Sequence, residues 1–422
     1  MGVPPKPKHV CIIGAGIVGS ATAYLLAQVG HCVTVLEAQA APGQLTSFAN
    51  GAQLSYSYVE PLATPATLRK LPSMMLDPDS PLRFRFTGEW AQMTWGLLFM
   101  RACRQSQVEY VTRALLGLSF LSRDELNSAR LADDLQFEYE EPGKLVVYDS
   151  EDGLFRARRQ VAFQRQLGCE QEVIGAAECL AREPALAAYA QHVCGGVWTP
   201  GDAVGDAHLL SRTLMARVQT MGGTVHYTRS AIGLRTEAGR VRAVTTDQGE
   251  VVADVVVLAN GPDSAALGRA MGLRLPIYPV KGYSVTLPVS NPSRAPTASI
   301  TDLRRKTVYG RLGSQFRIAG MAELVGHNLT IDQARIAFLV RCAHETFPGA
   351  CDLLADPQPW AGLRPATPTS MPLIGPARYP NLLLNVGQGS LGFTLAMGSA
   401  RLIERQLAGL PSAVGAPFAY RT

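Results

Sequence analysis

The chain has 422 residues, of which 47% are apolar, and 39 Lys or Arg against 34 Asp or Glu give it a formal net charge of +5. This composition predicts a globular protein of two or three domains with a large core. The basic residues are scattered, which argues against a nucleic-acid-binding face, and no run of about 18 apolar residues predicts a membrane-spanning helix.

The N-terminus carries Pro and Lys residues followed directly by an apolar strand, without the cleavage-site pattern of an export signal. The eight cysteines include no CxxC pair and no His/Cys spacing suited to zinc, so we expect buried thiols and no metal site. Both features favour the reducing cytoplasm.

The segment VCIIGAGIVGSATAYLLAQVGHCVTVLE predicts a strand, a phosphate-binding turn, a helix and a second strand. Gly14 permits the tight turn, Gly16 lets the backbone approach a pyrophosphate, and Gly19 lets the helix lie close to the strand. The second strand ends in Glu37, where an acid would bind the adenosine ribose. We therefore predict a dinucleotide-binding unit that uses the helix N-terminus for phosphate.

The following segment, APGQLTSFANGAQLSYSY, has no helical or strand period and predicts a loop that leaves the cofactor turn. Helices are predicted from about residue 64 to residue 134, best around 108–121, and they resemble an inserted cap. The stretch WAQMTWGLLFM at 90–100, followed by Arg101 and Arg104, has two open interpretations. It is either a core stripe or a helix on a membrane surface.

The second half of the chain predicts a helix capped by Asp206 and then two kinds of strand. Short strands are expected at 224–227, 241–246 and 255–258, the last returning to the nucleotide sheet. Alternating patterns between residues 276 and 320 predict an antiparallel sheet. A helix at about 332–347, a strand at 382–386, a glycine turn and a terminal helix complete the chain.

Seven motifs in this order resemble the D-amino acid oxidase superfamily of flavoproteins, most closely the D-amino acid dehydrogenase small subunit family. They are GAGIVG, TSFANGAQLS, TPGDAVGD, YPVKGYSVTLP, RIAGMAELVG, WAGLRPATP and NVGQGSLGFTLAMGSARLI. The resemblance implies an α/β fold with a glutathione-reductase-like (GR2) FAD-binding domain, a mixed or antiparallel substrate sheet and a helical cap. The FAD-binding domain is expected at 1–60, 195–275 and 355–422, and the substrate and cap domain at 61–194 and 276–354.

The resemblance also implies non-covalent FAD and assigns residues to it. The ADP end is assigned to the first glycine turn and Glu37, adenine to one backbone position, and the ring to the loop after Glu37 and the C-terminal turn. The positions are Gly14, Gly16, Gly19, Glu37, Ser47, Asn50, Gln53, Leu54, Ala231, Gly261, Gly387, Gly389, Leu391, Gly392 and Thr394. Two departures are Gln388, where the family usually has histidine, and the stretch SYSY at 55–58 in place of SPGY.

For catalysis, the resemblance implies that Arg364 in GLRP binds the substrate carboxylate, because a planar guanidinium gives two parallel charge-assisted hydrogen bonds. The alternative for Arg364 is an ordinary salt bridge. Tyr283 and Tyr309 lie on predicted strands where the superfamily places pocket aromatics, and the alternative for each is a half-buried sheet tyrosine. Tyr56 and Tyr58 are weaker candidates, and no general base is assigned.

The leading hypothesis is an FAD-dependent dehydrogenase that converts D-amino acids, or a cyclic relative such as D-proline or D-hydroxyproline, to imino acids. These hydrolyse to 2-oxo acids and ammonia, and the electrons pass to a quinone or respiratory carrier, with peripheral contact to the cytoplasmic membrane face. The alternatives are an oxidase of the same fold that forms hydrogen peroxide, an NAD-dependent dehydrogenase and a nucleotide-binding regulatory protein. The second glycine turn argues against the nicotinamide enzyme.

Overall fold

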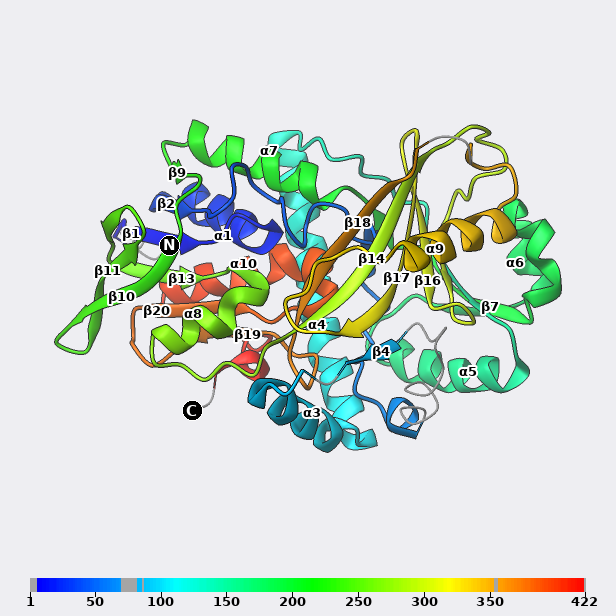
Figure 1. Cartoon of the computed structure of the whole chain (residues 1–422), viewed down its shortest axis with the longest axis horizontal. Coiled ribbons are helices and arrows are strands. Elements are labelled where there is room, and N and C mark those ends of the chain that lie inside the picture. Colours follow the sequence, from blue (N-terminus) through cyan, green and yellow to red (C-terminus); the bar gives the residue numbers. More distant parts are fainter. Residues whose placement is uncertain (1–5, 70–81, 86, 353–355, 421–422) are drawn as a thin grey trace.

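The computed structural model describes residues 6–69, 82–85, 87–352 and 356–420. Two β-sheets divide it into two lobes, and both chain termini lie on the lobe drawn at the left of Figure 1. The left-hand sheet has six strands, parallel except for its antiparallel edge strand. Its order is β19 (Leu373–Pro376), β20 (Leu382–Val386), β13 (Val255–Leu258), β1 (His9–Ile13), β2 (Cys32–Leu36) and β9 (Thr224–His226).

The central strands of this sheet are mostly apolar because both of their faces are covered. Three helices pack on one face: α1 (Ile17–Gln28), α7 (Ala207–Thr220) and α10 (Gly392–Leu407). The other face carries α8 (Ser264–Ala270) and a small antiparallel sheet of β10 (Ala231–Glu237), β11 (Arg240–Thr246) and β12 (Gly249–Val252).

The right-hand lobe is built on a mixed sheet of nine strands. Eight run in the order β18 (Gln358–Ala366), β14 (Tyr278–Pro288), β17 (Gln315–Leu324), β16 (Thr307–Leu312), β15 (Ser299–Asp302), β5 (Lys144–Tyr148), β7 (Gly195–Thr199) and β6 (Glu172–Gly175). The ninth, β4 (Leu82–Phe84), pairs with β17. The short strands β3 (Gln53–Leu54) and β8 (Ala203–Val204) pair separately and connect the lobes.

The two faces of the nine-stranded sheet have different covers. Helix α9 (Gln333–Thr346), α6 (Ala176–Arg182) and the 3-10 segment Pro184–His192 close one face over an apolar core. The opposite face meets α5 (Glu151–Arg165) at one end and the loop that contains β3 elsewhere. This second face therefore looks toward the first lobe.

Two further helices complete the structure: α3 lies at the bottom of Figure 1, and α4 runs behind the molecule from the bottom up to α7. Helix α4 (Gln105–Asp133) packs against α10, so this part of the predicted cap belongs with the first lobe. Helix α3 (Trp90–Ala102) packs through Trp95 and Phe99 on the strand region around Tyr278. None of the described helices has the length and apolar composition needed to cross a bilayer.

The expected fold class is confirmed, with one correction to the segment boundaries. Strands β7 and β18 fall inside the predicted FAD-binding segments 195–275 and 355–422, yet both belong to the nine-stranded sheet. The reason is pairing: β7 bonds to β5, and β18 bonds along its length to β14. Part of the predicted helical region, 70–81, lies outside the described residues.

Candidate functional site

The two glycine turns at opposite ends of the chain line one groove of about 550 Å³. Gly14 and Gly16 come from the turn after β1, and Gly389 and Gly392 come from the turn after β20. The strands are neighbours of β13 on either side, so their carboxyl ends bring both turns to the same edge of the sheet. This is the position where open α/β sheets bind ligands.

The N-terminal turn is shaped for a phosphate group. Gly14 has φ +103°, and a Cβ there would lie 2.7 Å from the carbonyl oxygen of Ala259. Gly19 lies outside the groove, where it allows α1 to pack against the Gly14 carbonyl. Helix α1 begins at Ile17 without a side-chain cap at Gly16, and Ser47 Oγ accepts from the Ile17 amide at 3.0 Å. The free amides and the positive helix end suit a pyrophosphate.

Glu37 lies in the groove, as expected for a ribose-binding acid. One carboxylate oxygen accepts from the Ala15 amide at 2.7 Å and the other from the Gln39 amide at 2.8 Å. Burial raises the pKa of Glu37, although these backbone hydrogen bonds oppose the shift. Each carboxylate oxygen has a further lone pair, so the group can still accept from ribose hydroxyls.

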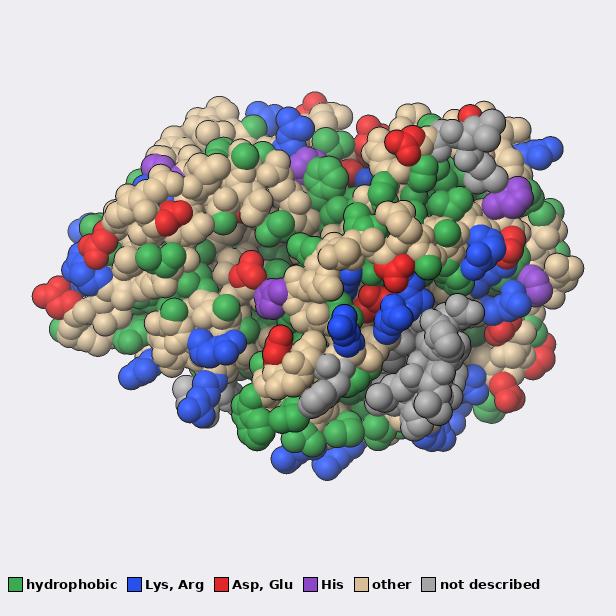
Figure 2. Space-filling view, viewed as in Figure 1, with side chains coloured by type: hydrophobic (Ala, Val, Ile, Leu, Met, Phe, Trp, Pro, Cys, Tyr) green, Lys and Arg blue, Asp and Glu red, His purple; other side chains and the backbone are tan. Residues whose placement is uncertain are grey.

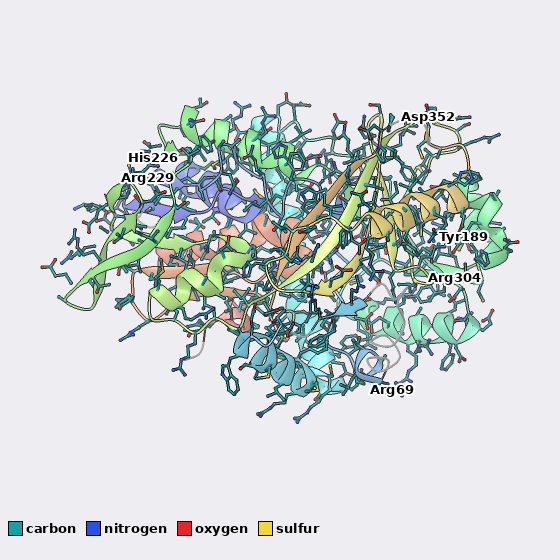
Figure 3. The ribbon with its side chains drawn as sticks, in the orientation of Figure 1. Arg69, Tyr189, His226, Arg229, Arg304 and Asp352 are labelled. Atoms are coloured by element: carbon teal, nitrogen blue, oxygen red, sulfur yellow. The ribbon has the colours of Figure 1, made fainter. Side chains whose placement is uncertain are left out.

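The nucleotide end contains groups that the sequence analysis did not identify. Ala231 and Gly261, both predicted, line the groove together with Arg229 and Asn260, which were not. Arg229 lies just beyond β9, near His226 in Figure 3, and its guanidinium donates to Thr246 Oγ1 at 3.0 Å. Its distance along the sequence from the glycine turn left no motif to reveal it.

The C-terminal turn closes the opposite end of the groove. Gly389 has φ +58°, and no protein atom lies within 4 Å of the position that a Cβ would occupy there, so its open side faces the groove. Gly387, with φ +83°, is placed just behind the groove against Thr367. Gln388 lines the groove, and its side-chain amide donates to Asn385 Oδ1 at 2.7 Å. Leu391 precedes α10 and caps it without a side-chain hydrogen bond.

The remaining predicted cofactor residues organise the loop rather than line the groove. Asn50 Oδ1 accepts from the Ala52 amide at 3.0 Å, Leu54 is buried, and Thr394 Oγ1 accepts from the Ser55 amide at 3.1 Å. Gln53 Nε2 donates to Ser299 Oγ at 2.7 Å. Direct contact of these four residues with the cofactor stays a prediction.

Arg364 has the properties of an anion-binding residue. Its Nη1 donates to the Met321 carbonyl at 2.8 Å, and no carboxylate of the described residues lies within ion-pair distance. Burial lowers the pKa of Arg364 to about 10, and burial is the only cause of this shift. The guanidinium lies over Gly282, where a Cβ would come within 2.6 Å of Arg364 Cζ. A guanidinium without a counter-charge is costly unless a ligand supplies one.

The sheet face that carries Arg364 looks toward the groove. Arg364 pairs with Val280 and Ser284 pairs with Trp360, so these side chains share a face. Ser284 Oγ donates to the Ala49 carbonyl at 2.6 Å, which holds the loop against this face. Arg364 itself is not among the residues that line the groove, although the next residue, Pro365, is.

Tyr283 and Tyr309 are placed on the other face of the same sheet. Tyr283 is opposite Ala361 and donates to Glu323 Oε2 at 2.9 Å, and Tyr309 packs between Phe316 and Phe347. Both belong to the core under α9. The two-residue period of a strand turns neighbouring side chains to opposite faces, and this placement corrects the predicted pocket role of both tyrosines.

A buried charged pair behind the cofactor loop was also missed. Lys144, 1% exposed, donates from Nζ to Gln53 Oε1 at 2.9 Å and to Ser55 Oγ at 2.7 Å, over the ring of Tyr58. Asp202, also 1% exposed, accepts from the Ser57 amide through Oδ1, and its Oδ2 has no hydrogen-bond partner among the described residues. Burial lowers the pKa of Lys144 to about 8 and raises that of Asp202 to about 6.

The carboxylate of Asp202 gives a pH-dependent prediction. The native carboxyl keeps its proton up to about pH 6, whereas the unfolded chain loses it near the ordinary value of 3.8. Stability is therefore lost as pH rises through this window, by about 3 kcal/mol at most, since each pKa unit corresponds to about 1.4 kcal/mol. We expect Asp202→Asn to match the wild type in urea unfolding at pH 4 and to exceed it increasingly up to pH 6. A difference that does not vary with pH would contradict this.

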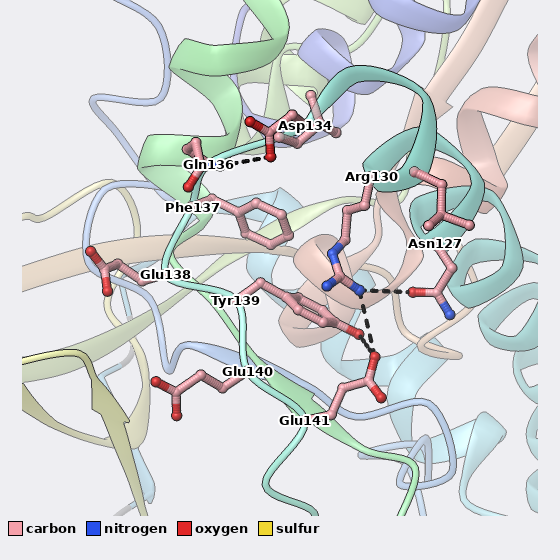
Figure 4. A pocket seen from close by; sticks show the side chains of 11 residues that line it. Asn127, Arg130, Asp134, Gln136, Phe137, Glu138, Tyr139, Glu140 and Glu141 are labelled. Atoms are coloured by element: carbon pink, nitrogen blue, oxygen red, sulfur yellow. Dashed lines mark hydrogen bonds and ion pairs between the residues drawn. The ribbon is translucent and has the colours of Figure 1, made fainter.

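A second hollow, of about 580 Å³, lies at the end of α4 and contains none of the predicted site residues. Figure 4 shows Arg130 against Tyr139, with Arg130 and the Tyr139 hydroxyl both directed at Glu141. Glu138 and Glu140 point away from this group. Among the described residues no three His, Cys, Asp or Glu side chains are arranged to hold a metal ion.

Comparison with known proteins agrees with this geometry. Residues 9–406 match the protein family described as DAO, FAD dependent oxidoreductase. The chain is 44% identical to "D-amino acid dehydrogenase 2" of Ralstonia nicotianae over 421 residues, covering 97% of this chain and 99% of the relative. It is 45% identical to a protein of the same name from Pseudomonas aeruginosa, with 96% of each chain covered.

Solved structures with the same fold have low sequence identity. Glycine oxidase from Geobacillus kaustophilus superposes with a TM-score of 0.75 at 20% identity and 98% coverage of each chain. L-Proline dehydrogenase from P. horikoshii gives 0.73 at 17% identity, covering 97% of this chain and 96% of that one. At this identity the likeness concerns the fold.

Proposed function

The chain belongs to the family of FAD-dependent oxidoreductases, and on this basis we propose that it is a dehydrogenase of D-amino acids. It oxidises the amino acid to an imino acid, which water converts to a 2-oxo acid and ammonia. A cyclic substrate such as D-proline or D-hydroxyproline gives a cyclic imine. The names of relatives at 44% and 45% identity support D-amino acids as the substrate class.

The observation that carries the proposal is Arg364, a partly buried arginine that forms no ion pair with the described residues and is followed directly by Pro365, which lines the cofactor groove. It binds the substrate carboxylate in a charge-assisted, bidentate manner, and so fixes the orientation of the α-carbon. When bound, FAD would supply the acceptor for the hydride that leaves the α-carbon. The amine proton is lost to water or on binding, and no general base is required of the chain.

Each part of the groove fits one part of FAD. The uncapped N-terminus of α1 receives the pyrophosphate, and Glu37 accepts from the ribose hydroxyls. Gly389 and the N-terminus of α10 approach the ring, where a positive helix end favours added negative charge. The nicotinamide alternative gains no support from this family or from the second glycine turn.

We further propose that the electrons pass to a quinone and that α3 rests on the membrane surface that holds it. Trp90, Leu97 and Met100 are 78%, 60% and 46% exposed, whereas Trp95 and Phe99 anchor the helix from beneath. Figure 2 shows hydrophobic side chains gathered over α3, with Lys or Arg along their outer edge. Arg101 lies in the last turn of α3 and Arg104 follows the helix, and both are exposed. Basic residues in this position are expected for a helix that binds an anionic bilayer surface.

This surface predicts a specific loss of lipid binding. The double substitution Trp90→Glu with Leu97→Glu should lower the fraction that sediments with phosphatidylglycerol-containing vesicles at least tenfold, because it removes two apolar anchors and adds like charge. The matched control is Leu131→Glu on α4, since Leu131 is 89% exposed and lies outside α3. Equal binding by the double variant and the control would contradict the proposal.

An anaerobic panel tests the main proposal. The purified protein is mixed with D- and L-amino acids and with the isomers of proline and hydroxyproline, and loss of the oxidised-flavin absorbance is followed. We expect bleaching by D-isomers alone, turnover with a quinone analogue, and no stoichiometric hydrogen peroxide in air. Bleaching by L-isomers would overturn the stereochemical assignment, and peroxide formation at the rate of turnover would make the protein an oxidase.

A further inference from the structure

Lys144 and Asp202 lie on the far side of the loop that separates them from the cofactor groove. Lys144 begins β5 and contacts the loop at Gln53 and Ser55. The Ser55 amide bonds to Thr394 in the first turn of α10, directly after the turn that lines the groove. One hydrogen-bonded residue therefore separates the Lys144 ammonium from the helix end that faces the ring of FAD.

The two charged side chains are buried and contact different residues of the loop. Lys144 contacts the residues nearest to α10, whereas Asp202 contacts the loop farther along, at the Ser57 amide. No ion pair joins Lys144 to any carboxylate of the described residues. Ser55 thus joins Lys144 to α10, whereas the hydrogen bond of Asp202 is to the Ser57 amide of the same loop.

A purely structural role would not require these charges. A neutral side chain of similar length fills the space of Lys144, and burying an ammonium among uncharged acceptors disfavours folding. The unpartnered Oδ2 of Asp202 adds to that cost. Costly buried charges next to a redox cofactor are expected where they change the energy of that cofactor.

We propose that Lys144 and Asp202 set the reduction potential of the bound FAD. Reduced flavin carries more negative charge than oxidised flavin, so the nearby ammonium stabilises the reduced state and the carboxylate opposes it. Water does not screen the pair, and its effect extends through the intervening loop. Both are positioning residues, because they act through the loop and through charge without touching the substrate.

The test measures the two-electron reduction potential of the holoenzyme by anaerobic equilibration with dithionite and a reference dye. Lys144→Met should lower the equilibrium constant for reduction at least tenfold, which is about 30 mV for a two-electron couple. Asp202→Asn should raise the equilibrium constant for reduction. The control is Lys281→Met, since Lys281 is also buried and lies over Tyr283, but on the sheet face that looks away from the groove.

Opposite shifts in the two variants, with an unchanged control, support the proposal, because general damage does not produce opposite signs. The proposal is overturned if Lys144→Met and Asp202→Asn shift the reduction potential in the same direction. It is also overturned if the shifts of Lys144→Met and Lys281→Met agree within twofold. If Lys144→Met does not retain FAD, Gln53→Glu replaces it, since a carboxylate there neutralises the ammonium and should also lower the potential. The measurement uses no amino acid, so its outcome is independent of the substrate proposal.

Discussion

Arg364→Met should lower kcat/KM for the amino acid substrate by about a thousandfold while FAD remains bound. Methionine keeps the length of the side chain and removes the charge, so the substrate carboxylate would enter the site without a partner. Losing one member of a buried, hydrogen-bonded charge pair costs about 2–5 kcal/mol, and about 1.4 kcal/mol corresponds to a tenfold change in rate. Anaerobic stopped-flow measurement of flavin bleaching, with FAD content from absorbance, tests both parts.

Two companion variants separate charge from position. Arg364→Lys keeps the charge but loses the planar fork, so an intermediate loss is expected. Gly282→Ala keeps the arginine but displaces it, because a Cβ at this position would come within 2.6 Å of Arg364 Cζ. We expect a loss of at least tenfold from Gly282→Ala with normal FAD content. If Arg364→Met changed kcat/KM by less than tenfold, Arg364 would not be the residue that binds the substrate carboxylate.

Gly389→Trp should yield protein that contains less than a tenth of the FAD of the wild type. The indole would extend into the groove, since no protein atom lies within 4 Å of the Cβ position and the open side faces the cofactor. The substituted residue would also be strained, because φ at this position is +58°. Flavin absorbance of the purified, folded protein is the measurement.

A glycine at the other end of α10 provides a matched control for the backbone strain that Gly389→Trp introduces. Gly409 has φ +70° and equally open surroundings, but it follows the helix C-terminus and lies outside the groove. Gly409→Trp therefore introduces similar backbone strain without obstructing the cofactor, and it should retain FAD. Normal FAD content in Gly389→Trp, or an equal loss of FAD in both variants, would show that the C-terminal turn does not bind the cofactor.

Local pattern was informative wherever short-range geometry determines the structure. The first glycine turn requires positive φ and close packing. Because only glycine meets these requirements, glycines recur at fixed spacing around Gly14. A terminal acid on the next strand follows from the same unit, and the structure places Glu37 in the groove. Arg364 came from a family motif, since a single arginine has no spacing that distinguishes a ligand-binding role from a salt bridge.

Pairing between distant segments decided the rest. Tyr283 and Tyr309 were assigned to the pocket because the superfamily places aromatic residues on these strands. The face that each side chain occupies depends on pairing with distant strands, and both tyrosines lie under α9. Strands β7 and β18 belong to the second sheet because they pair with β5 and β14, which lie far from them in the sequence.

The sequence by itself determined the nucleotide-binding unit, the fold class and the family, because each depends on contacts within one short segment or on motifs in fixed order. Only the tertiary structure could place Arg229 in the groove and Lys144 and Asp202 behind the loop next to it. They come from segments of ordinary composition, and their chemistry arises from burial and from neighbours remote in the chain. Burial changes the energy of a charge far more than any local sequence feature does, so the role that we propose for Lys144 and Asp202 could be inferred only from the folded structure.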